Sequence, residues 1–137
     1  MRRVILVVAV WFGLVSLPGS ALSADAAKAP DGKPVFVKYK CGSCHTIETQ
    51  KIVKKPAATA EPGPEAPDLS GVGVERKAEW IVAFLQKKEK IGESMHEKKF
   101  RGTDPELKKL AGWLATLNDE AAAKKMKDVE AKNAKTK

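Results

Sequence analysis

The two cysteines of the chain lie close together and are followed directly by a histidine. Cys41, Cys44 and His45 form the pattern C-x-x-C-H, with Gly42 and Ser43 between the thiols. Two thiols and an imidazole at this spacing suit four kinds of chemistry: a redox-active dithiol, a zinc site, a structural disulfide, or covalent attachment of a haem. The rest of the sequence distinguishes among them.

The pattern is typical of c-type haem attachment. Two thiols three residues apart can reach the two vinyl groups of one porphyrin, and the next residue then carries its imidazole under the ring, directed at the iron. The sequence therefore predicts one covalent haem c, bound through Cys41 and Cys44, with His45 as an axial ligand of the iron.

The three other chemistries lack support elsewhere in the chain. A thioredoxin-type dithiol needs strands and βαβ units, and the sequence has no strand pattern. Zinc usually takes four protein ligands in paired clusters, whereas His96 stands alone far downstream. A disulfide closing so short a loop would constrain the unfolded chain very little. Haem attachment is the interpretation that the chain supports.

The N-terminus has the pattern of a secretory signal. An arginine pair after Met1 precedes an apolar run over residues 4–15, which ends in small residues up to Ala24. The run is shorter than the about 20 apolar residues that cross a bilayer, so we expect cleavage and no stable membrane insertion. Residues 1–24 are assigned to the signal, although cleavage after Ala21 or Ala26 also fits, and the protein is expected in the periplasm.

The mature chain is one small basic domain. Two of the 25 basic residues belong to the signal, which leaves 23 against 17 acidic ones, a net charge of about +6 before haem propionates are counted. A domain of this size often needs a covalent or metal staple. The charge predicts acidic protein partners, and no nucleic acid is expected to bind.

Two helices are predicted on either side of a long loop. The first is capped by Asp31, tolerates Pro34 in its first turn and leads into the cysteine motif. A proline-rich surface loop follows over residues 46–67. The second helix covers about residues 75–90, with an apolar stripe widened by Trp80.

A third helix has the clearest start signal in the sequence. Thr103 and Glu106 form a capping-box pair, and the apolar residues that follow recur at i, i+3, i+4 and i+7. The haem-binding domain is assigned to residues 25–118. Residues 119–137 are Lys- and Ala-rich and are predicted to be a frayed helix or disordered.

Taken together, the motifs resemble those of the class I c-type cytochromes over about residues 31–117. The shared features are the helix leading into C-x-x-C-H, a Pro-Asp-Leu-Ser-Gly stretch, a Trp-bearing helix, a methionine-bearing loop and a last helix with an aromatic, here at Cys41–His45, Pro67–Gly71, Trp80, Met95 and Trp113. The resemblance implies an all-α fold, with three main helices wrapped around one haem.

The resemblance also implies particular contacts. In this family the first and last helices cross at right angles, so Gly32 and Phe36 are expected to meet Leu110 and Trp113. A proline carbonyl at the position of Pro67 would accept the Nδ1 proton of the axial histidine, which fixes the ring and makes it a better ligand.

The second axial ligand has three candidates. Met95, His96 and Met126 are all chemically able, because haem iron accepts methionine or histidine opposite a histidine. We expect Met95, because it lies in a polar stretch between two helices with no apolar stripe to join, and because its surroundings resemble the family's ligand loop. His96 would then be an exposed neighbour, and Met126 a weak contact of the tail.

The expected function is electron transfer rather than catalysis. With histidine and methionine bound, the iron has no open position for a substrate, so the protein would carry one electron between acidic redox partners as a monomer. A group of basic residues on both sides of Met95 would face such partners: Lys87, Lys88, Lys90, Lys98, Lys99 and Arg101. The alternatives are a haem subunit docked on a periplasmic dehydrogenase and a haem-based sensor or gas binder.

Overall fold

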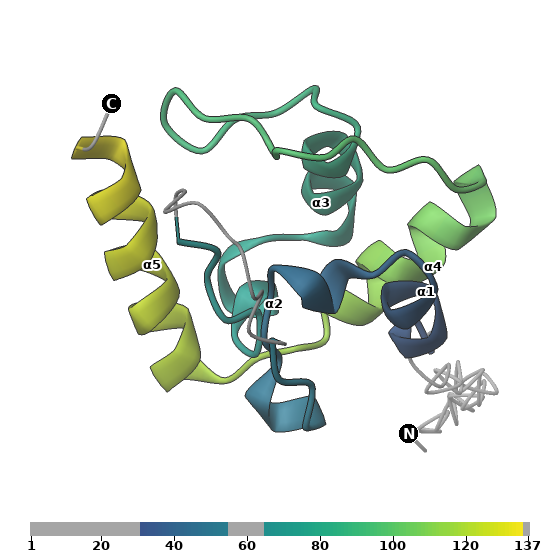
Figure 1. Cartoon of the computed structure of the whole chain (residues 1–137), viewed down its shortest axis with the longest axis horizontal. Coiled ribbons are helices and arrows are strands. Elements are labelled where there is room, and N and C mark those ends of the chain that lie inside the picture. Colours follow the sequence, from purple (N-terminus) through teal and green to yellow (C-terminus); the bar gives the residue numbers. More distant parts are fainter. Residues whose placement is uncertain (1–30, 55–64, 136–137) are drawn as a thin grey trace, which may run out of the picture.

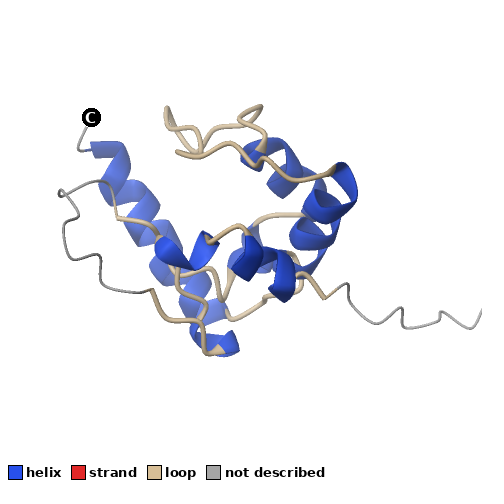
Figure 2. Cartoon of the chain, turned by 45° about the vertical axis from the view of Figure 1, so that its right-hand side comes forward, coloured by secondary structure: helices blue, strands red, loops and turns tan. Residues whose placement is uncertain are grey.

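The computed structural model describes residues 31–54 and 65–135, and the fold in these ranges is helical (Figures 1 and 2). The α-helices are α1 (Lys33–Lys38), α2 (Val72–Glu75), α3 (Ala78–Leu85), α4 (Asp104–Leu114) and α5 (Glu120–Lys135), and two 3₁₀ turns lie at Cys41–Ser43 and Glu48–Gln50. Strand-like pairing in the described ranges is confined to the bridges Ile47–Ile52 and Ile91–Ser94. The predicted all-α class is confirmed.

Two predictions fall on residues that lie outside these ranges. They are the signal at residues 1–24 and the middle of the proline-rich loop. Among the helices that are described, none has both the length and the apolar character needed to cross a bilayer.

Helices α1 and α4 cross in close contact (Figure 1). Gly32, the N-cap of α1, lies against the backbone of α4: a Cβ at this position would lie 2.5 Å from the Cβ of Trp113 and 2.8 Å from the carbonyl oxygen of Lys109. One turn later, the Phe36 ring meets the edge of Trp113 with 5.8 Å between centroids. The contact that the resemblance implied between these two helices is confirmed.

The middle of the chain forms two helices where one was predicted over residues 75–90. Arg76 and Lys77 have extended backbone between α2 and α3, and α3 ends at Leu85. The residues after Leu85 are almost all charged or polar, so they offer no apolar face to pack against the core. Because most helical stability in proteins comes from packing such a face, the helix ends there.

The loop predicted over residues 46–67 contributes to the core, which the sequence pattern did not indicate. Ile47 is fully buried. Its backbone exchanges two hydrogen bonds with Ile52, at 2.8 and 3.1 Å, which close a short turn around Glu48–Gln50. The loop is therefore not purely a surface segment, because this turn carries one large side chain inward.

The C-terminal segment forms the longest helix of the described chain, which corrects the prediction of a frayed or disordered tail. Helix α5 packs against α2 and buries Ala123 and Met126. A Cβ on Gly71 would overlap the backbone at Asp119 and Ala123, so this glycine permits the close approach. The side chain of Asp119 accepts a hydrogen bond from the Ala122 N–H at 2.8 Å and caps the first turn.

Ion pairs also hold α5 in place. Arg76 pairs with Glu130 at 3.3 Å, with both side chains largely buried, and Lys127 pairs with Glu75 at 2.9 Å. The apolar stripe of α5 consists of small alanines and a single methionine, so its periodicity is weak in the sequence. Its packing depends on Gly71, which allows the close approach, and on ion pairs with Glu75 and Arg76, which lie far from α5 in the sequence.

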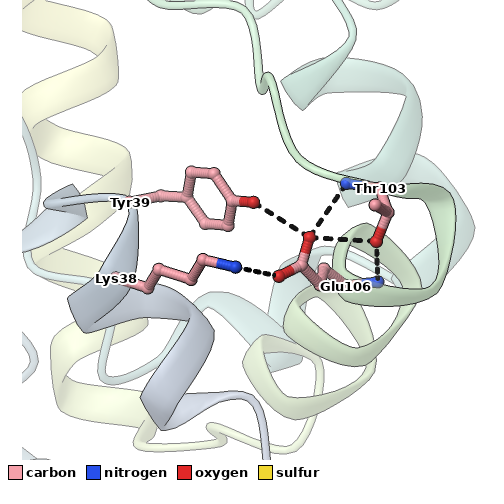
Figure 3. Close-up of polar contacts among 4 residues, drawn as sticks. All are labelled: Lys38, Tyr39, Thr103 and Glu106. Atoms are coloured by element: carbon pink, nitrogen blue, oxygen red, sulfur yellow. Dashed lines mark hydrogen bonds and ion pairs between the residues drawn. The ribbon is translucent and has the colours of Figure 1, made fainter.

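Glu106 joins the start of α4 to the end of α1 (Figure 3). Its carboxylate accepts a hydrogen bond from the Thr103 N–H at 2.9 Å, and Thr103 Oγ1 accepts one from the Glu106 N–H, which confirms the predicted capping box. The same carboxylate pairs with Lys38 at 2.6 Å and accepts the Tyr39 hydroxyl at 2.9 Å. The Lys38 ammonium, together with the Thr103 and Tyr39 donors, lowers the pKa of Glu106 to about 2.

We expect this carboxylate to make the fold sensitive to acid. Its pKa is about 2 in the folded state against an ordinary 4.5, so folding favours the ionised form. The stabilisation is complete above about pH 5 and is lost as the pH falls towards about 2. Glu106→Gln should therefore be less stable than the wild type at neutral pH, and the difference should shrink in acid. Urea unfolding of both haem-loaded proteins at several pH values measures this difference, and one that does not change with pH would refute the role of the ionised carboxylate.

Candidate haem site

The two cysteines and the histidine lie on one tight turn at the end of α1. Lys40 takes the left-handed backbone conformation (φ 54°) and ends the helix, and the 3₁₀ turn Cys41–Ser43 follows at once. The N–H groups of Cys44 and His45 both donate to the carbonyl of Cys41, at 3.1 and 3.0 Å. The three functional side chains therefore leave the backbone within a single turn.

The thiols have the properties of attachment points rather than of a redox dithiol. Cys41 and Cys44 are both free and partly buried. Burial raises the pKa of the Cys41 thiol. A catalytic dithiol needs the opposite shift, because the thiolate is its nucleophile.

His45 is held in the orientation that a metal ligand needs. Its Nδ1 lies 3.0 Å from the carbonyl oxygen of Pro67, which confirms the contact implied by the resemblance. A hydrogen bond from the Leu69 N–H to the Thr46 carbonyl, at 2.9 Å, keeps the Pro67 segment beside the motif. Because a carbonyl can only accept, Nδ1 carries the proton, and Nε2 keeps the lone pair that binds a metal.

The environment of His45 also keeps its ring neutral. Burial lowers the pKa of this histidine, against the opposing effect of the Pro67 carbonyl. A metal ligand must be unprotonated at the nitrogen that binds, so a lowered pKa favours coordination at neutral pH.

The loop between α3 and α4 supplies the side chain that faces His45. The ring of His96 is parallel to that of His45 within 12°, with 6.1 Å between centroids. Phe84 from α3 forms an edge-to-face pair with the His96 ring, with 5.4 Å between centroids, and Trp80 stacks on Phe84 with 4.9 Å between centroids. Aromatic side chains of α3 therefore line this side of the site.

The two methionine candidates differ in their burial. Met95 is 50% exposed, whereas Met126 is 2% exposed and belongs to the hydrophobic core under α5. Of the three candidates for the second axial position, His96 is the one whose ring faces that of His45 in the structure. No sequence pattern indicates this, because adjacent residues of an irregular loop have no period that tells which side chain points inward.

The donor set fits a covalently bound haem. Two thiols on one turn match the two vinyl groups of a porphyrin, and a neutral imidazole with a fixed Nε2 matches its iron. In such a site Cys41 and Cys44 would form the thioether bonds, and His45 would bind the iron.

Comparison with known families agrees with this chemistry. A family model described as cytochrome c matches residues 29–133, so the chain belongs to the cytochrome c family. The searches of curated proteins and of solved structures find no match. The cofactor is haem c, one iron porphyrin attached covalently at the C-x-x-C-H motif, and the family's role is electron transfer.

Proposed function

We propose that the protein is a periplasmic carrier of single electrons and not an enzyme. The observation that supports this most strongly is the pair of facing side chains at the site, His45 and a residue of the loop between α3 and α4. A haem iron with both axial positions filled has no place to bind and activate a substrate. What the bound haem supplies is reversible exchange of iron between its ferric and ferrous states.

Each part of the chain has a defined task in this proposal. Cys41 and Cys44 keep the haem attached outside the cell, where a lost cofactor would not be replaced. The carbonyl of Pro67 fixes the tautomer and orientation of His45. Phe84 and Trp80 place apolar surface next to the axial pair, which limits access of water and favours the less charged ferrous state.

Two alternatives would give different results on purification and in spectra. A haem subunit of a periplasmic dehydrogenase should copurify with that enzyme, whereas a diffusing carrier elutes as a monomer. A gas sensor should bind carbon monoxide in its ferrous state without any mutation. A monomer whose ferrous spectrum does not change with carbon monoxide supports the carrier.

A basic surface next to the site favours an acidic partner. The group Lys87, Lys88, Lys90, Lys98, Lys99 and Arg101 is exposed, on the segments that lead into and out of the loop carrying His96. Three exposed carboxylates lie among them, Glu89, Glu93 and Glu97, which leaves the segment with three net positive charges. A positive surface raises the local concentration of a negatively charged partner by long-range attraction.

We therefore expect electron transfer to an acidic partner to slow steeply as salt is added. Attraction between exposed charges is screened over about 8 Å at physiological ionic strength, so it acts mainly on the rate of encounter. Changing Lys98 and Lys99 together to glutamate should lower the bimolecular rate at low salt by about tenfold and flatten its salt dependence. Stopped-flow oxidation of the ferrous protein by an acidic redox protein, over a salt series, measures both effects.

The matched control reverses the same charges on another face. Lys124 and Lys125 of α5 are exposed, and their joint change to glutamate alters the net charge equally. This control should reduce the rate much less. Equal effects from the two pairs would mean that only net charge matters, and the proposed docking surface would be wrong.

A further inference from the structure

We propose that His96, not Met95, binds the haem iron on the face opposite His45, so that the iron has two histidine ligands. This inference rests on the proposed function, since it requires a haem bound through His45. His96 takes the place of the methionine that the family resemblance led us to expect. The identity of this ligand also affects the reduction potential of the haem.

The first observation is the relative position of the two rings. An imidazole nitrogen binds a first-row metal at about 2 Å and the ring centre lies about 1.2 Å beyond it, so two imidazoles on opposite sides of one iron have centroids about 6.4 Å apart. The centroids of His45 and His96 are 6.1 Å apart, and the rings are parallel within 12°. Both values fit two rings that share one iron.

The second observation is that both histidines are oriented in the same way. Nδ1 of His45 faces the carbonyl of Pro67, and Nδ1 of His96 faces the carbonyl of Lys98. In each ring Nδ1 is therefore the donor and Nε2 keeps its lone pair. A backbone carbonyl behind the ring is the usual support of a metal-binding histidine, because it fixes the tautomer and raises the basicity of the ligand.

The third observation is that the loop holds His96 on both sides. Before it, Ile91 and Ser94 exchange two backbone hydrogen bonds, at 2.9 and 3.0 Å, across a turn in which Gly92 has φ 58°. After it, the Phe100 N–H donates to the Leu85 carbonyl at 2.9 Å, which ties the loop back to the end of α3.

This support also extends to the imidazole itself. The rings of Phe84 and His96 form an edge-to-face pair with 5.4 Å between their centroids. The ring is thus positioned by a side chain of α3 as well as by its own loop, and little freedom would be lost on binding a metal.

Neither methionine has comparable support. The Met95 side chain is half exposed. Met126 is buried under α5 as part of the core, so using its sulfur would require part of that core to open.

The experiment measures ligation spectroscopically in the haem-loaded protein and in two adjacent variants. The ferric wild type should lack the methionine-to-iron charge-transfer band in its absorption spectrum, and its ferrous form should not bind carbon monoxide. His96→Ala should open the iron and gain carbon monoxide binding. Met95→Leu is the matched control, because it changes the neighbouring side chain, and it should leave both spectra unchanged.

A third variant tests the redox consequence. His96→Met should introduce the charge-transfer band and raise the reduction potential, since methionine opposite histidine raises the potential of a c-type haem.

Several outcomes would overturn the inference. They are a methionine band in the wild type, carbon monoxide binding by Met95→Leu but not by the wild type, and no gain of carbon monoxide binding in His96→Ala. Carbon monoxide binding by the wild type would refute the proposed carrier as well, because it would show an open iron. The wild-type band needs no variant, so a poorly folded His96→Ala protein does not remove the test. Loss of the haem from the denatured wild type is a different result, because it would refute the covalent haem and the proposed function with it.

Discussion

The double variant Cys41→Ser, Cys44→Ser should lose all of its haem on denaturation, whereas the wild type should keep one haem per chain. The thioether bonds are the only covalent links that the motif can make to a porphyrin, while axial coordination by a histidine is broken when the chain unfolds. Each single variant keeps one thiol and should retain haem more weakly. Intact mass of the denatured protein and haem staining after denaturing electrophoresis give the result directly.

The matched control for this prediction lies inside the same turn. Ser43 is exposed, and Ser43→Ala changes the motif without removing a thiol. It should attach haem like the wild type. Retention of haem by the double variant after denaturation would refute the attachment, and equal loss in Ser43→Ala would mean that the integrity of the turn, not the sulfur chemistry, decides the outcome.

Gly32→Ala is expected to destabilise the fold by about 3 kcal/mol, a large effect for a single methyl group. The added Cβ would lie 2.5 Å from the Cβ of Trp113 and 2.8 Å from the carbonyl oxygen of Lys109. Two of the three nearest atoms belong to the backbone of α4, so a side-chain rotation cannot relieve the overlap. Helices α1 and α4 would have to move apart, and chemical denaturation of the haem-loaded protein measures the cost.

A second glycine provides the comparison. At Gly42 a new Cβ would have its nearest contact at 3.4 Å, with the Ile52 side chain, which is an ordinary packing distance. Gly42→Ala should therefore change the stability much less than Gly32→Ala. Equal losses would mean that the cost comes from the backbone freedom of glycine and not from the close crossing of the two helices.

The parts of the fold that the sequence predicted best are those with local chemical signals. The start of α4 follows from Thr103 and Glu106, whose side chains and backbone groups satisfy each other within one turn. The turn that carries Cys41, Cys44 and His45 follows from the requirements of one cofactor. The contact of His45 with Pro67 and the crossing through Gly32 were available only through the family resemblance, because they join residues that are distant in the sequence.

The parts that could not be predicted depend on tertiary contacts. Helix α5 has a weak apolar stripe, and what stabilises it is the close approach that Gly71 allows and a pair between Arg76 and Glu130. Ile47 is buried by a turn that closes on Ile52, inside a segment whose composition indicates a surface loop. For α5 the partners lie on another part of the chain, and for Ile47 the partner is Ile52, across a turn within the same segment.

The choice of the second axial ligand also depends on tertiary contacts, here between two neighbouring residues. Met95 and His96 are neighbours, both able to bind iron, and composition favours neither. The side chain that faces His45 is set by the turn between Ile91 and Ser94 and by the edge of Phe84. These contacts depend on how the loop folds back on α3, which a sequence pattern does not specify.

The proposed transfer of single electrons by this cytochrome depends above all on a haem iron with both axial positions filled. An optical redox titration of the wild-type protein, followed by exposure of the ferrous form to carbon monoxide, tests it most directly. We expect a single reversible one-electron transition and a ferrous spectrum that carbon monoxide does not change. A ferrous spectrum that shifts with carbon monoxide would show an open iron and contradict the claim.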